Sequence, residues 1–200
     1  MSEKELESTL NASKSIQSDY EFNRVLLNLL EDQNFESKQL EKLTISAENL
    51  KSNYERSKFL RAIISKRNVD EASLKLVLKA SEELGSNYEQ AKVISAVMKA
   101  VNELDPCYKE LLDAIQKVTS NYEKSKLLSQ VINFELSNSQ MNALLTAIEG
   151  VSQDYEKSKL LQKLGPKLPA SDTKLVEAYR RVAKTIGSDY EYGKVMRAID

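Results

Sequence analysis

Hydrophobic residues recur along the chain with the spacing of amphipathic helices. After Tyr122, the apolar residues Leu127 and Leu128 fall five and six positions later, and an apolar face that includes Leu111 and Ile115 precedes it. Apolar positions three to four residues apart lie on one face of an α-helix. The pattern therefore predicts two helices around each such tyrosine, which we call helix A (before it) and helix B (beginning at it).

The tyrosine belongs to a tandem repeat. A Tyr-Glu pair recurs six times with tyrosine spacings of 34, 34, 34, 33 and 35 residues. A constant period of this length is typical of repeats that each form one supersecondary unit. The pairs are Tyr20-Glu21, Tyr54-Glu55, Tyr88-Glu89, Tyr122-Glu123, Tyr155-Glu156 and Tyr190-Glu191.

A capping signal precedes most of the pairs. Serine two residues before the tyrosine and glutamate one residue after it form an S-x-x-E capping box, which marks a helix start. The boxes are Ser18/Glu21, Ser52/Glu55, Ser86/Glu89, Ser120/Glu123 and Ser188/Glu191. The fifth copy reads Ser152-Gln153-Asp154, and there we expect Asp154 to cap. Gly85 and Gly187 stand where helix A should end, as C′ glycines do.

These signals predict an all-α fold, with more than about 75% helix and no strand. Helix A is expected near 3–16, 36–50, 70–84, 106–118, 138–151 and 172–186. Helix B is expected near 19–32, 53–66, 87–102, 121–135, 154–164 and 189–200. The expected architecture is a right-handed αα-solenoid in one domain, 1–200, with units of about 34 residues near 1–33, 34–67, 68–103, 104–136, 137–169 and 170–200.

Composition excludes most catalytic chemistry. The chain has no histidine, one cysteine (Cys107) and five scattered glycines, so it lacks His-based catalysis, cysteine-cluster metal sites and a glycine-rich phosphate loop. We expect no enzyme activity, no cofactor and no metal. Lys+Arg is 29 and Asp+Glu is 30, and the net charge of −1 argues against a nucleic-acid partner.

The N-terminal residues Met1-Ser2-Glu3 lack the apolar region of a signal peptide, and no apolar run is long enough for a membrane span. The sequence predicts a cytoplasmic monomer without membrane contact, unless the chain is an excised region of a longer exported protein.

The Ser-Asp/Asn-Tyr-Glu-x-x-Lys frame resembles a helical repeat of uncharacterised bacterial proteins. It is also similar to the repeat region that follows the peptidase domain of BlaR-type metallopeptidase sensors. The resemblance covers nearly the whole chain and implies a role in partner contact, but the His-Glu-x-x-His zinc motif of those sensors has no counterpart here. The Trp, Leu-Gly and Pro signature of tetratricopeptide repeats is absent, whereas the expected architecture resembles that of HEAT-type αα-solenoids.

Helix B carries the candidate partner-binding residues. The fourth residue after each tyrosine is basic: Arg24, Lys58, Lys92, Lys126, Lys159 and Lys194. These bases either pair with the glutamate three residues earlier or form a basic ladder on one face. The eighth residue is Ala62, Ala96 or Ala198 in three units and Asn28, Gln130 or Lys163 in the others.

The recurrent tyrosines have two interpretations. They are expected to pack between neighbouring helix pairs, and the alternative is an exposed binding platform. Helix B is expected to line a concave face that binds a peptide or protein with acidic groups. The predicted function is thus a non-catalytic interaction scaffold, and the alternative is a nucleic-acid-binding HEAT-like protein.

Overall fold

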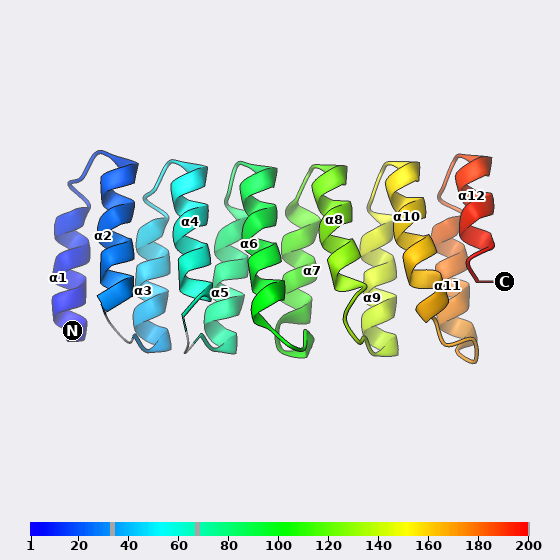
Figure 1. The fold of residues 1–200 in the computed structure, drawn as a ribbon, viewed down its shortest axis with the longest axis horizontal. Coiled ribbons are helices and arrows are strands. Elements are labelled where there is room, and N and C mark those ends of the chain that lie inside the picture. The colour runs from blue at the N-terminus through cyan, green and yellow to red at the C-terminus, as the bar shows by residue number, and fades with distance from the viewer. Residues whose placement is uncertain (33–34, 67–68, 200) are drawn as a thin grey trace. The chain divides into compact units, whose positions relative to one another are not determined.

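The computed structural model describes residues 1–32, 35–66 and 69–199, and within them every regular element is a helix (Figure 1). The all-α prediction is confirmed. Helices make up 73%, slightly less than predicted. The chain forms two compact units, Met1–Asn102 and Glu103–Asp200. The division falls within one residue of the predicted boundary between the third repeat (68–103) and the fourth (104–136).

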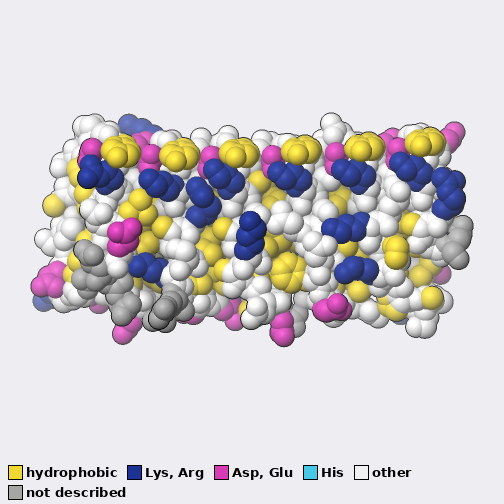
Figure 2. All heavy atoms as spheres, viewed as in Figure 1, with side chains coloured by type: hydrophobic (Ala, Val, Ile, Leu, Met, Phe, Trp, Pro, Cys, Tyr) yellow, Lys and Arg dark blue, Asp and Glu magenta, His cyan; other side chains and the backbone are white. Residues whose placement is uncertain are grey.

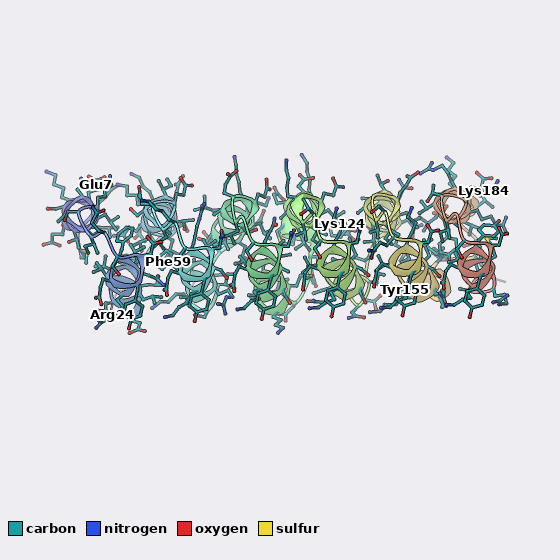
Figure 3. The ribbon with its side chains drawn as sticks, turned by 90° about the horizontal axis from the view of Figure 1, so that it is seen from above. Glu7, Arg24, Phe59, Lys124, Tyr155 and Lys184 are labelled. Carbon is teal, nitrogen blue, oxygen red and sulfur yellow. The ribbon has the colours of Figure 1, made fainter. Side chains whose placement is uncertain are left out.

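Unit 1 contains three helix pairs. Its helices are α1 (Glu3–Ser13), α2 (Asp19–Asp32), α3 (Ser37–Ala47), α4 (Asn53–Ile64), α5 (Glu71–Glu82) and α6 (Asn87–Ala100). The A helices α1, α3 and α5 contact one another in order, and so do the B helices α2, α4 and α6. Two layers result, and the fully buried Phe59 lies between them (Figure 3).

Unit 2 repeats this plan. It contains η1 (Asp105–Cys107), α7 (Tyr108–Lys117), α8 (Asn121–Val131), α9 (Asn138–Glu149), α10 (Asp154–Leu164), η2 (Gly165–Lys167), α11 (Thr173–Ala183) and α12 (Asp189–Met196). Helices α7, α9 and α11 form the A layer, and α8, α10 and α12 form the B layer. Tyr179 of α11 is fully buried, and its hydroxyl lies 3.0 Å from the Leu161 carbonyl oxygen and 3.1 Å from that of Val195.

Helix starts agree with the prediction, whereas most helices end earlier than predicted. At each of the five predicted boxes, the serine Oγ accepts a hydrogen bond of 3.3 Å from the glutamate backbone N–H. At Ser52, Ser86 and Ser188, which all lie in the described residues, the reciprocal glutamate bond of a complete box is absent. The helices end early because their last turns are tighter: a backbone N–H bonds to the carbonyl oxygen three residues earlier rather than four, as at Leu50 and Val118.

Two predictions about helix ends and caps are wrong. Among the described glycines none has a positive φ, so Gly85 and Gly187 are not left-handed C′ caps. Asp154 does not cap α10; the N-cap is Gln153, and Asp154 is the first helical residue. Its carboxylate accepts hydrogen bonds of 3.0 Å from the backbone N–H groups of Gly187 and Ser188 in the following repeat.

The residue before the repeat tyrosine therefore joins neighbouring helix pairs. Asn53 Oδ1 accepts a hydrogen bond of 2.8 Å from the Gly85 N–H, and Asn121 Oδ1 accepts one of 3.0 Å from the Ser152 N–H. In each case the donor lies in the linker between helix A and helix B of the next repeat. An Asp or Asn at this position satisfies backbone groups that the linker leaves unpaired.

Asp154→Ala should lower the free energy of unfolding by about 1–3 kcal/mol, because two linker N–H groups lose their acceptor. Asp189→Ala is the matched control: Asp189 has the same position in the last repeat of the chain, and both residues lie in the first turn of a helix. Urea unfolding of both variants measures the difference. Equal losses of unfolding free energy in the two variants would show that Asp154 stabilises its own helix rather than the linker of the next repeat.

No helix in the described ranges combines the length and the apolar character needed to cross a membrane.

Candidate functional site

Every helix B carries its repeat tyrosine on the outside. The six rings are between 53% and 72% exposed, so the prediction that they pack between helix pairs is wrong. Successive residues of an α-helix are rotated by about 100°. The positions five, six and nine residues after the tyrosine, which face the core, are therefore centred about 180° around the helix axis from the tyrosine. The ring consequently points away from the core, as Tyr155 does in Figure 3.

The recurrent bases lie against these rings. Arg24 Cζ is 5.7 Å from the centre of the Tyr20 ring, and Lys92 Nζ is 4.8 Å from that of Tyr88 and 5.8 Å from that of Tyr54. In unit 2, Lys126, Lys159 and Lys194 lie 5.2, 5.2 and 5.1 Å from the rings of Tyr122, Tyr155 and Tyr190. These distances are in the range of cation–π interactions. Lys58 is half-buried, and the base over the Tyr54 ring is Lys92 of α6, the next B helix.

The recurrent glutamate pairs with the same base. Nitrogen–oxygen distances are 3.2 Å for Arg24–Glu21, 3.3 Å for Lys92–Glu89 and Lys126–Glu123, 3.7 Å for Lys159–Glu156 and 3.1 Å for Lys194–Glu191. The predicted pairing with the glutamate three residues earlier is confirmed at these five positions. A base with both partners is held in one orientation, which lowers the entropy that a ligand must remove.

The glutamate also contacts the preceding helix B. Asn23 Nδ2 donates a hydrogen bond of 2.5 Å to Glu55 Oε2, and the Ser158 hydroxyl donates one of 3.4 Å to the Glu191 carbonyl oxygen. Ser158, and to a smaller extent the Lys194 ammonium, holds the pKa of Glu191 below its ordinary value. Asn23 and Ser158, each three residues after a repeat tyrosine, are fully buried.

We call the exposed tyrosines and the bases beside them the tyrosine lane of each unit. In unit 1 the lane comprises Tyr20, Tyr54, Tyr88, Arg24, Lys58 and Lys92; in unit 2 it comprises Tyr122, Tyr155, Tyr190, Lys126, Lys159 and Lys194. Figure 2 shows basic side chains (dark blue) beside hydrophobic ones (yellow, a class that includes Tyr) over the B helices of each unit. In Figure 3, Arg24 points away from the A layer of unit 1, whereas Glu7 lies on the opposite side.

A surface pocket of about 550 Å³ adjoins the lane of unit 2. Residues of α8 and α10, together with Lys194 of α12, line it. Tyr122, Tyr155, Lys126, Lys159 and Lys163 contribute aromatic and cationic groups, and Glu156 is its one carboxylate. Sequence reasoning placed the lane lysines on this face but did not identify the pocket.

The lane and its pocket combine exposed aromatic rings with charged side chains. Three of the pocket's four lysines, Lys126, Lys159 and Lys194, are paired with glutamates. Within the described residues, no three His, Cys, Asp or Glu side chains come together as a metal site would require. No protein-family model, curated protein or solved structure matches the chain.

Proposed function

We propose that the protein is a non-catalytic αα-solenoid scaffold whose B helices line a concave face and bind an acidic peptide or protein segment. The observation that carries the proposal is the tyrosine lane: in each repeat a ring more than half exposed stands beside a fixed cation. Exposed tyrosine contributes large contact area at low entropy cost, and a neighbouring ammonium selects acidic groups.

The spacing of the lane suggests the form of the ligand. Helices that pack side by side are about 8–10 Å apart. An extended peptide rises about 3.3 Å per residue, so every third side chain would meet a successive repeat. An acidic residue at every third position matches the lane best.

The alternative ligand is single-stranded nucleic acid, which stacks its bases on exposed aromatic rings. Phosphate chains require a succession of unpaired cations. In the lane, five of the six bases are paired with glutamate, which favours a ligand of lower charge density.

The test uses a fluorescein-labelled peptide with four repeats of Glu-Ser-Thr, acetylated and amidated at its ends. Fluorescence anisotropy of the full chain should show saturable binding to this peptide and at least about tenfold weaker binding to the matched Gln-Ser-Thr peptide. Equal affinity for the two peptides would contradict the proposal. Stronger, salt-sensitive binding to an oligothymidylate would instead favour the nucleic-acid alternative.

A further inference from the structure

Lys163 distinguishes the pocket of unit 2 from the rest of the lane. The equivalent position, eight residues after the tyrosine, is Ala62, Ala96 or Ala198 in three other repeats. The longer Lys163 side chain reaches from α10 to α8, where its Nζ donates hydrogen bonds to the carbonyl oxygen (2.6 Å) and the hydroxyl (2.9 Å) of Ser129. The ammonium group is thus fixed at the pocket wall by neutral acceptors.

Charge pairing singles out the same residue. The other three lysines of the pocket each pair with a glutamate of their own helix: Lys126–Glu123, Lys159–Glu156 and Lys194–Glu191. Lys163 donates its two hydrogen bonds to neutral oxygens of Ser129. Its positive charge is therefore not neutralised, and the pocket carries that charge. An ammonium has three N–H donors, and Ser129 uses two of them.

The environment of Lys163 favours a bound anion. Lys163 is exposed, but partial desolvation of its ammonium, and to a smaller extent the charge of Lys167, lowers the pKa of Lys163 below its ordinary value. An anion in contact would offset both effects by stabilising the charged ammonium. Tyr122 and Tyr155 supply aromatic walls against which the methylene groups of an acidic side chain can pack.

We propose that this pocket is the anchoring subsite for one carboxylate of the acidic ligand, with the Lys163 ammonium as its main contact. The inference rests on the proposed function and specifies where one carboxylate of the peptide is held. The carboxylate can belong to a glutamate or aspartate side chain or to a peptide C-terminus. A single unpaired cation suits one carboxylate better than a chain of phosphates.

The experiment measures the affinity of full-length variants for the amidated Glu-Ser-Thr peptide by anisotropy. Lys163→Ala installs the residue of three other repeats and should weaken binding about tenfold, as loss of a charge-assisted hydrogen bond does. Lys163→Arg should retain most of the affinity. The control Lys174→Ala removes the same charge from an exposed residue of α11 and should change affinity less than about twofold.

Two outcomes separate the subsite from the proposed function. If wild type prefers the Glu peptide over the Gln peptide but Lys163→Ala binds it as well as wild type does, the lane stands and the subsite is overturned. If wild type shows no preference, the proposed function fails and the subsite with it.

Two further arms identify the source of the anion. A Gln-Ser-Thr peptide with a free C-terminus that binds wild type but not Lys163→Ala would assign the pocket to terminal carboxylates. An oligothymidylate that binds more tightly than the Glu peptide and loses affinity in Lys163→Ala would overturn the carboxylate in favour of phosphate. Circular dichroism melting of each variant verifies that the fold is retained.

Discussion

Tyr179→Ala is expected to lower the free energy of unfolding by about 3–5 kcal/mol, as large-to-small changes of buried aromatic residues do. Tyr179 is fully buried in unit 2. Its hydroxyl is within hydrogen-bond distance of the carbonyl oxygens of Leu161 and Val195, which come from α10 and α12. The variant would therefore lose core volume and the hydrogen bonds of the Tyr179 hydroxyl, while each carbonyl keeps a backbone N–H donor. Burial also raises the pKa of Tyr179, so the hydroxyl stays protonated and able to donate.

Tyr155→Ala is the control for this variant. It makes the same change in the same unit, but the ring is exposed beside Lys159. Its loss should cost less than about 1 kcal/mol, as surface substitutions do. The two urea midpoints should therefore differ clearly at equal slope. If Tyr155→Ala were as destabilising as Tyr179→Ala, the repeat tyrosines would be core residues, as first predicted.

Helix starts could be predicted because their signals are local. A serine Oγ that accepts the N–H three residues later needs only its own turn, and the predicted starts of helix B agree with the structure. Helix ends depend on how the linker packs. The sequence pattern predicted most helices to end two to four residues later in the chain than they do. The helix expected near 106–118 is preceded by the short η1 (Asp105–Cys107), and α7 begins at Tyr108.

The exposed tyrosines were predictable, although recurrence suggested a core role. The apolar positions five, six and nine residues later define the buried direction of helix B, and the tyrosine lies opposite it. The same rotation places the glutamate at the edge of the buried face. Glu55 and Glu89 are accordingly buried, rather than fully solvated beside the base.

Contacts between repeats could not be derived from one repeat. Asn53 reaches the linker at Gly85, and Asn23 reaches Glu55, in each case 32 residues further along the chain. Their partners become evident only when neighbouring helix pairs are placed side by side. Lys163 was visible as a departure from the alanine at its position, but its contact with Ser129 depends on the distance between α8 and α10.

Reversing three lane bases should remove binding of the Glu-Ser-Thr peptide. The variant Lys58→Glu, Lys92→Glu, Lys126→Glu replaces cations of both lanes with carboxylates. Affinity should fall by about a hundredfold or more, because each reversal replaces an attraction by a repulsion of the acidic ligand. Melting should change little, since partly exposed ion pairs such as Lys92–Glu89 and Lys126–Glu123 contribute little to stability.

The matched control reverses three exposed lysines of the A helices: Lys79 of α5, Lys109 of α7 and Lys174 of α11. Both variants change the net charge of the chain equally, so a general electrostatic effect would weaken binding in both. A specific lane predicts that the control keeps an affinity within about threefold of wild type in 0.15 M salt, where exposed charges beyond about 8 Å are screened. Undiminished binding by the lane variant, or equal loss in the control, would show that the peptide is not held by the B-helix face.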